Sequence, residues 1–365
     1  MGRVSRAIAS LLVAAALGPA LARERLPAAA EQALQRAQVP PAALVVVVQD
    51  ATRGTQRLAW QAKLPVNPAS VVKLATTYAA LDLLGPSWQW TTPVWLVGRL
   101  NQGVLEGDVV IKGNGDPKLV LERVWLLLRR VRQMGVREIR GDIVLDRSAF
   151  VVPEQSPADF DGEPLRPYNV QPDALLLNYK SVLLNFVPAA PRDDVAVVAE
   201  PPLAGVRIDD SVVLSHGPCN DWRAALKAEF DDPSRIRFSG SYPASCGEKQ
   251  WPVAYADPAS YNARAIRALW AEAGGQLGGQ VRDGAAPAGT APTFEVASPP
   301  LADVVRDINK YSNNVMAQQL FLTLALQRDP AQPATPQAAR AALQEWLAAR
   351  AGDLPPGLQL DNGSG

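Results

Sequence analysis

Hydrophobic and polar positions follow two different periods along this chain. Between residues 89 and 150, apolar and polar side chains alternate in the runs TTPVWLVGRL, VLEGDVVIKG and EIRGDIVLD, as in strands that bury one face. The segment LERVWLLLRRVRQMG, between the last two runs, has the spacing of an amphipathic helix instead. Together with the Pro-rich segment VVPEQSPADFDGEPLRPYNVQPD that follows, residues 87–186 are predicted to form an α+β unit with a long loop.

The next part of the chain reads as a small β-rich unit. Residues 187–253 contain the short runs VAVVAE, GVRIDDSVVL and SRIRFSGSY and both cysteines of the chain. The segment GGQVRDGAAPAGTAPT, further on, is rich in Gly, Ala and Pro and is predicted to be a surface loop. The motif GNGDP lacks the Lys-Ser/Thr of a phosphate loop and is predicted to be a hairpin turn.

A helix with a reactive pattern is predicted in VNPASVVKLATTYAALDLLG. Asn67 is a suitable N-cap, Pro68 suits the first helical position, and Gly85 followed by proline ends the helix. Ser70 and Lys73 then share one helix face. A serine hydroxyl becomes a nucleophile when a neighbour takes its proton, and a buried lysine with a lowered pKa can do so. The chain contains no other serine with a lysine three positions later, which favours a Ser-x-x-Lys acyl-transfer site.

Enzymes of this kind add a Ser-x-Asn motif, for which the chain offers two candidates. Ser260 and Asn262 fall in the first turn of a helix predicted to start after Asp257, where they look like surface positions. Ser312 and Asn314 instead interrupt two apolar periodicities, at a connection between helices that can point both side chains into a cleft. The second pair is preferred, although Ser312 is also a plausible plain N-cap.

Composition excludes several other functions. With 36 basic and 36 acidic residues the chain has no net charge, so nothing suggests a nucleic-acid partner. The only histidine, His216, lies in a predicted loop, which disfavours a Ser-His-Asp hydrolase and a zinc site. No metal and no cofactor are expected.

The first 22 residues look like a cleaved secretory signal peptide. Arg3 and Arg6 precede a short apolar run that ends before a small-residue site closing at Ala22. The run is too short to span a bilayer, so we expect an exported protein with no integral membrane anchor. In an oxidising compartment such as the periplasm, the isolated pair Cys219 and Cys246 is expected to form a disulfide.

The stretches PVNPASVVKL, GDVVIKGNGDPKL, IRGDIVLDRSAF and INKYSNNVMAQQLF resemble the D-alanyl-D-alanine carboxypeptidase/endopeptidase family of the penicillin-binding protein 4 type, class C of low molecular mass. Pro65 stands where the family has Phe. The resemblance implies an α+β fold in which a transpeptidase-like, β-lactamase-like domain (23–86 and 254–365) is interrupted by two nested insertions (87–186 and 187–253).

The resemblance also implies a reaction and its residues. Ser70 would be the nucleophile, Lys73 its general base, and Ser312 a proton relay to the leaving amine. Asn314 would hold the substrate backbone, and the N–H of Ser70 would form half of an oxyanion hole. The partners implied are peptidoglycan stem peptides, cleaved at D-Ala-D-Ala or at cross-links, and β-lactams as inhibitors.

One motif of the family is not found. No lysine is followed by Thr-Gly or Ser-Gly, and the sequence given stops at LQLDNGSG, where family members continue to a Lys-Thr-Gly strand. The chain therefore looks like a truncated member that lacks the C-terminal part of its transpeptidase-like domain, either a fragment of a longer gene product or an inactive remnant. Two alternatives stay open at this point: a serine β-lactamase, and a non-catalytic peptidoglycan-binding protein.

Overall fold

The computed structural model describes residues 25–189 and 194–365, and the chain divides into two compact units, residues 1–67 and 68–365. The predicted signal peptide lies outside the described residues. In the first unit, two strands form an antiparallel hairpin in which Val46 pairs with Trp60. The elements of this unit are α1 (Ala28–Arg36), the 3-10 turn η1 (Pro41–Ala43), β1 (Val46–Gln49) and β2 (Gln56–Trp60).

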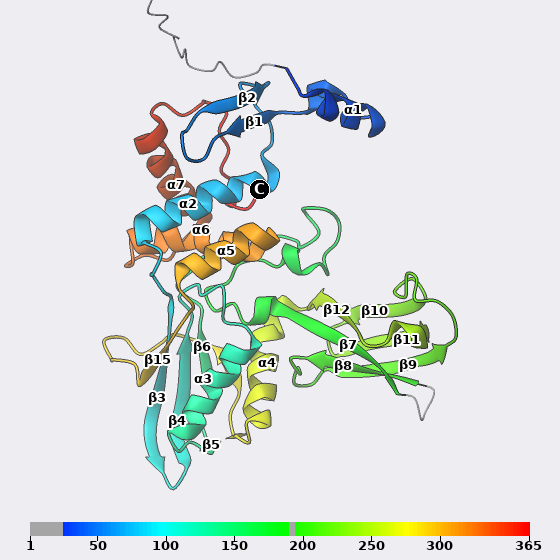
Figure 1. Cartoon of the computed structure of the whole chain (residues 1–365). Coiled ribbons are helices and arrows are strands. Elements are labelled where there is room, and N and C mark those ends of the chain that lie inside the picture. Colours follow the sequence, from blue (N-terminus) through cyan, green and yellow to red (C-terminus); the bar gives the residue numbers. More distant parts are fainter. Residues whose placement is uncertain (1–24, 190–193) are drawn as a thin grey trace, which may run out of the picture. The chain divides into compact units, whose positions relative to one another are not determined.

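The second unit contains a seven-stranded sheet built largely from the predicted α+β segment (Figure 1). Its centre is an antiparallel hairpin in which Val94 pairs with Ile111, and an amphipathic helix, α3, contributes one buried face to the same core. The predicted strands and helix are thus confirmed. The elements are β3 (Thr91–Asn101), β4 (Val104–Lys112), α3 (Leu121–Gln133), β5 (Glu138–Ile139) and β6 (Ile143–Asp146).

Three later strands join this sheet from beyond the β-rich segment. Strand β13 (Gln276–Leu277) pairs with β5, β14 (Val281–Asp283) with β6, and β15 (Phe294–Ala297) with β3. The sheet therefore extends past the boundary expected at residue 254. The prediction of a plain loop over 278–293 is wrong at β14, because Val281 pairs in parallel with Ile143.

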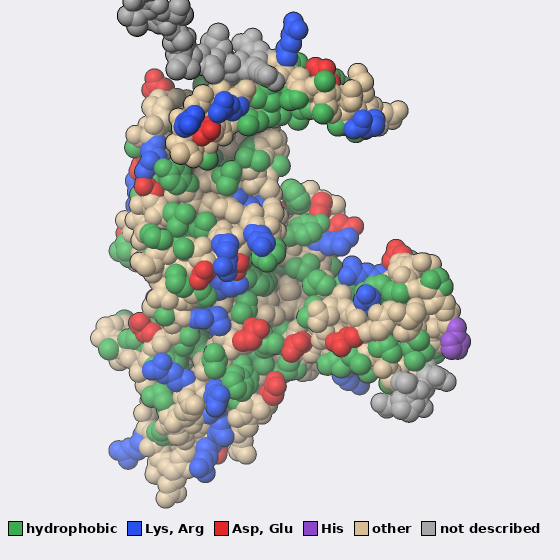
Figure 2. All heavy atoms as spheres, in the orientation of Figure 1, with side chains coloured by type: hydrophobic (Ala, Val, Ile, Leu, Met, Phe, Trp, Pro, Cys, Tyr) green, Lys and Arg blue, Asp and Glu red, His purple; other side chains and the backbone are tan. Residues whose placement is uncertain are grey.

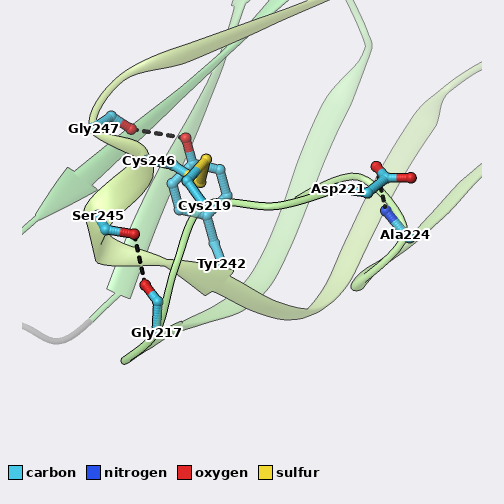
Figure 3. Close-up of a disulfide and its surroundings, with 8 residues drawn as sticks. All are labelled: Gly217, Cys219, Asp221, Ala224, Tyr242, Ser245, Cys246 and Gly247. Carbon is cyan, nitrogen blue, oxygen red and sulfur yellow. Dashed lines mark hydrogen bonds between the residues drawn. A yellow bond between two sulfur atoms is a disulfide. The ribbon is translucent and has the colours of Figure 1, made fainter.

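The β-rich segment forms a separate six-stranded sheet in the order β10-β11-β9-β8-β7-β12. Its disulfide joins Cys219 to Cys246 as predicted, next to a hydrogen bond from Tyr242 to the carbonyl of Gly247 (Figure 3). The predicted runs missed β7, β10 and β12, and β7 begins before the boundary expected at residue 187. The strands are β7 (Ser181–Ala189), β8 (Asp194–Glu200), β9 (Arg207–Ser215), β10 (Leu226–Asp232), β11 (Arg235–Pro243) and β12 (Lys249–Ala254), with the 3-10 turn η5 (Ala244–Cys246).

Four helices form a second hydrophobic core, which carries the candidate site (Figure 1). Helix α6 is apolar around most of its surface and is buried among the other three, as expected for a central core helix. Helix α4, which packs in the first core, starts as predicted, with the Asp257 side chain accepting from Ser260 N. The helices are α2 (Lys73–Leu84), α4 (Pro258–Glu272), α5 (Leu301–Tyr311), α6 (Asn314–Arg328) and α7 (Pro336–Ala351).

The prediction that the GNGDP segment is a hairpin turn is wrong. The segment forms the loop that leads from β4 to α3. Gly115 N donates to the carbonyl of Ala174 at 2.8 Å, and a side chain at Gly113 would collide with the same carbonyl. The glycines are therefore required by close backbone packing. The hairpin turn of this region lies instead between β3 and β4.

On the face drawn in Figure 2, Lys and Arg side chains are interspersed with Asp and Glu side chains. Residues 25–189 and 194–365 contain no helix that combines the length and hydropathy needed to cross a bilayer.

Candidate active site

Ser70 lies in a 3-10 turn, η2 (Ala69–Val72), directly before α2. The prediction that the α-helix begins at Pro68 is wrong: it begins at Lys73, because Ala69 has a left-handed φ of 45° that an α-helix cannot include. Gly85 ends the helix as predicted, with φ 83°. Ala69 is a non-glycine residue in the left-handed conformation directly before Ser70. Backbone strain of this kind clusters at functional sites.

Ser312 and Asn314 lie at the predicted connection between α5 and α6. Ser312 ends α5 in the left-handed conformation, with φ 52°. Asn313, not Ser312, is the N-cap of α6, since its side chain accepts from Met316 N at 3.0 Å. The Ser312 side chain is thus left free of a capping role.

Lys73 connects these two parts of the chain. Its Nζ lies 2.9 Å from Ser70 Oγ and 2.7 Å from Asn314 Oδ1. A third neighbour, the backbone carbonyl oxygen of Ser364, lies 2.6 Å from the same nitrogen. Among the described residues no hydrogen bond joins Ser312 to this group.

Burial disfavours the charged form of Lys73. Its side chain is only 2% exposed, whereas Ser70 lies at the surface. Burial lowers the pKa of Lys73, and no carboxylate within the described residues forms an ion pair with it. A neutral amine has two N–H groups and one lone pair. Because the carbonyl oxygens of Asn314 and Ser364 can only accept, both N–H groups have partners and the lone pair can face the Ser70 hydroxyl.

Side chains of α2 and α5 hold Lys73 in place. Thr77 Oγ1 donates to the Lys73 carbonyl at 2.8 Å, and Asn309 Nδ2 donates to the same oxygen of Thr77 at 3.2 Å. Thr76 Oγ1 donates to the carbonyl of Gly363 at 2.7 Å. The sequence assigned no role to residues 362–364. The motif DNGSG stands out in the sequence, but a contact made by a backbone carbonyl cannot be read from the residue types.

Ser70 opens onto a cleft of about 650 Å³. Ser312 and Asn314 also line it, and Lys73 contacts Ser70 and Asn314, so the structure brings together all four residues of the predicted site. Other lining residues come from the loop before β7 and from β7 itself. Further lining residues are Phe160, Pro167, Tyr168, Asn178, Tyr179, Ser181, Val182, Leu183, Pro252, Tyr311, Asn313 and Val315.

The other candidate motif does not line this cleft. Ser260 Oγ accepts from Arg264 Nε at 2.9 Å, within α4. The expectation that Asn262 is a surface residue is wrong. It is 3% exposed, and its Nδ2 donates to the carbonyl of Leu175 at 2.8 Å. Its role is to satisfy a buried backbone group.

The single histidine of the chain does not line this cleft. His216 is exposed in the loop after β9, in the other sheet. Across the described part of the chain, no group of three or more His, Cys, Asp or Glu side chains is placed to hold a metal ion.

The fold is similar to that of solved penicillin-binding proteins. A crystal structure of penicillin binding protein 4 (dacB) from Haemophilus influenzae has a TM-score of 0.69 at 21% identity, over 88% of this chain and 70% of that one. The structure of the same protein complexed with a β-lactam has a TM-score of 0.61 at 19% identity, over 87% of this chain and 69% of that one.

Sequence comparison finds D-alanyl-D-alanine carboxypeptidases among the relatives of this chain. A D-alanyl-D-alanine carboxypeptidase of Actinomadura sp. (strain R39) is 26% identical over 336 residues, covering 88% of this chain and 60% of the relative. The D-alanyl-D-alanine carboxypeptidase DacB of Haemophilus influenzae is 34% identical over 82 residues, 22% of this chain and 17% of the relative. The chain thus matches less than two thirds of the length of these curated relatives. The sequence profile of the D-Ala-D-Ala carboxypeptidase 3 (S13) family matches residues 26–365, and the chain belongs to this family.

Proposed function

We propose that this protein is a serine D-Ala-D-Ala carboxypeptidase and endopeptidase that acts on peptidoglycan stem peptides and cross-links through an acyl-enzyme. The observation that carries the proposal is the contact of one buried amine, Lys73 Nζ, with both Ser70 Oγ and Asn314 Oδ1. Family membership and the strained backbone at Ala69 and Ser312 support it.

In the first step Lys73 is the general base. As Ser70 Oγ bonds to the carbonyl carbon of the penultimate D-Ala, its proton passes to the lone pair of Lys73 Nζ. The carbonyl π electrons move to the oxygen, and the backbone N–H of Ser70 stabilises the resulting oxyanion. Asn314 orients the substrate backbone while its Oδ1 holds Lys73.

The tetrahedral intermediate collapses when the C–N bond breaks. The electron pair goes to the leaving nitrogen, and the proton held by Lys73 returns to it through the Ser312 hydroxyl. Ser312 lines the same cleft as Ser70, which is consistent with this relay. Water then attacks the acyl-enzyme, Lys73 takes its proton, and that proton restores the Ser70 hydroxyl as the second product leaves.

β-Lactams would acylate the same serine, since their strained amide imitates D-Ala-D-Ala. The protein would act in the periplasm after removal of residues 1–22. The sheet formed by β7–β12 and the sheet around β3 and β4 would be the domains inserted into the transpeptidase-like part.

The test uses the whole chain and a fluorescent penicillin. We expect a stable adduct that peptide mass mapping places on Ser70 and that the Ser70→Ala variant does not form. A folded chain without an adduct would overturn the proposal. Rapid release of the adduct would indicate a β-lactamase, and muropeptide binding without turnover would indicate a non-catalytic wall-binding protein.

A further inference from the structure

The third neighbour of Lys73 belongs to a segment without an assigned role. Ser364 is 1% exposed, and its carbonyl oxygen lies 2.6 Å from Lys73 Nζ, although 291 residues separate them. Because Lys73 is buried, its amine bonds to this backbone carbonyl instead of to water. The orientation of the amine therefore depends on the position of the Ser364 carbonyl. The question is therefore what holds the Ser364 carbonyl against Lys73.

The side chain of Asn362 folds this segment into a tight turn. Its Oδ1 accepts three hydrogen bonds, from Ser364 N at 2.9 Å, Ser364 Oγ at 3.0 Å and Gly365 N at 3.3 Å. Asn and Asp side chains form such turns because they accept from backbone N–H groups two residues on. The oxygen of Asn362 therefore sets the direction of the peptide unit whose carbonyl faces Lys73.

Two further contacts hold the turn between α2 and α6. Thr76 Oγ1 donates to the carbonyl of Gly363 at 2.7 Å, and Gln318 Nε2 donates to Ser364 Oγ at 3.3 Å. Gly363 has φ 74° and its Cα lies close to the Phe321 ring, so the backbone is packed tightly here. These contacts anchor the turn, whereas the three bonds to Asn362 determine its shape.

We propose that Asn362 is a positioning residue of the catalytic site, which holds the Ser364 carbonyl so that the free electron pair of Lys73 points at Ser70. This inference rests on the proposed function of Lys73. With both carbonyls in place, the two N–H groups of the neutral amine are occupied by Asn314 and Ser364. Without the Ser364 carbonyl, the amine turns an N–H toward Ser70, and the base is present but wrongly oriented.

The test compares three variants of the full chain by the rate of penicillin acylation across a pH series. Asn362→Leu keeps the approximate size and removes the acceptor. Asn362→Asp keeps the acceptor oxygen and adds a negative charge. Asp361→Ala changes the neighbouring side chain, which is 89% exposed and pairs with Arg340, and serves as the matched control.

We expect Asn362→Leu to lower the acylation rate at the high-pH plateau by about 10-fold to 100-fold, a fraction of the whole effect of a general base. Asn362→Asp should keep the plateau, because all three bonds remain, but move the acid limb to higher pH, because a nearby negative charge favours protonated Lys73. Asp361→Ala should match the unmodified chain. A purely structural loop would give no such difference between Leu and Asp. An unchanged rate and profile in folded Asn362→Leu would overturn the inference.

A second readout does not depend on acylation. Labelling of Lys73 by an amine reagent, normalised to the exposed Lys227 in the same sample, should be several-fold faster in Asn362→Leu than in the unmodified chain. In Asn362→Asp it should be no faster than in the unmodified chain, because the turn is kept and the added charge favours the protonated, unreactive amine. Equal labelling in all variants would refute the role of Asn362. If the unmodified chain forms no adduct, the proposed function fails, and the labelling comparison alone decides on Asn362.

Discussion

Nζ of Lys73 lies 2.7 Å from Oδ1 of Asn314, although 241 residues separate them. This contact joins the first residue of α2 to the first residue of α6, and so fixes the two helix starts that border the cleft. Because an amide oxygen can only accept, it also dictates which way the amine of Lys73 faces. One hydrogen bond thus links the packing of the helical core to the direction of proton transfer.

Replacing Lys73 by arginine should abolish the base while keeping a long side chain that donates hydrogen bonds. A guanidinium stays protonated in proteins, so Lys73→Arg is expected to acylate about 10²-fold to 10⁴-fold more slowly with a fluorescent penicillin. The exposed Lys310, at the end of α5, provides the matched control, and Lys310→Arg should acylate normally. An active Lys73→Arg variant would mean that another group takes the Ser70 proton.

Replacing Asn314 by aspartate should move the pH dependence of acylation. A carboxylate in place of the amide oxygen, 2.7 Å from Nζ, favours protonated Lys73 and so raises its pKa. The acid limb of the acylation rate should shift to higher pH, with a large loss at pH 7 that is partly recovered in alkaline buffer. Asn313→Asp adds the same charge one residue away, on a side chain that caps α6 through Met316 N and has no hydrogen bond to Lys73, and should shift the acid limb much less. A limb that stays unmoved in Asn314→Asp would argue against Lys73 as the titrating base.

The same burial predicts a dependence of stability on pH. Since burial lowers the pKa of Lys73 below its ordinary 10.5, the unfolded chain binds a proton that the native chain lacks between these two values. Stability rises with pH wherever the unfolded state binds more protons. The free energy of unfolding of the unmodified chain, relative to Lys73→Met, should therefore rise as the pH increases through the native pKa toward 10.5. Urea unfolding at a series of pH values measures it, and a flat or falling difference would contradict the prediction.

The sequence predicted which side chains of the candidate site meet better than it predicted the backbone that carries them. The spacing of Ser70 and Lys73 was readable because both residue types are needed one turn apart, and the 3-10 turn that replaces the first helical turn keeps them close. The left-handed φ of Ala69 was not predictable, because alanine carries no signal for that conformation. The contact of the Ser364 carbonyl with Lys73 was not predictable either. Every residue has a backbone carbonyl, and only tertiary packing determines which group it faces.

Strand pairing was predictable only where it is local. The β3–β4 hairpin has a clear alternating pattern and a short turn. Strands β13 and β14 are two and three residues long, too short for a period to show, and they pair with β5 and β6 from more than 100 positions away in the sequence. Such pairings depend on the packing of α3 and α4 and not on local sequence.

Removing the disulfide should destabilise the six-stranded sheet without affecting the nucleophile. Closing a loop of 27 positions restricts the unfolded chain, so replacing both Cys219 and Cys246 by serine should lower the free energy of unfolding by about 3–4 kcal/mol. Urea unfolding followed by tryptophan fluorescence measures the loss, since Trp222 and Trp251 pack in that sheet. Below the transition, penicillin acylation should be unchanged. A loss of acylation in the folded variant would show that the sheet contributes to the site.

Asp173 is expected to be the most costly charge to remove near the cleft. Its carboxylate is 6% exposed and lies 2.6 Å from the buried Lys180 and 2.8 Å from Arg147. Asp173→Asn keeps the size but leaves Lys180 buried without its counter-charge, and breaking such a pair costs about 3–5 kcal/mol. The free energy of unfolding in urea should fall by this amount.

The matched control for Asp173 is Asp283, which also pairs with Arg147, at 2.6 Å, but through a side chain that is 58% exposed. Asp283→Asn should cost at most about 1 kcal/mol, because solvent screens exposed pairs. Lys180 ends a turn of three consecutive left-handed residues, 178–180, two of which line the cleft. Loss of its ion pair should therefore also weaken penicillin binding by Asp173→Asn at temperatures where the variant is folded. Equal losses of stability in the two variants would show that burial does not distinguish the two carboxylates.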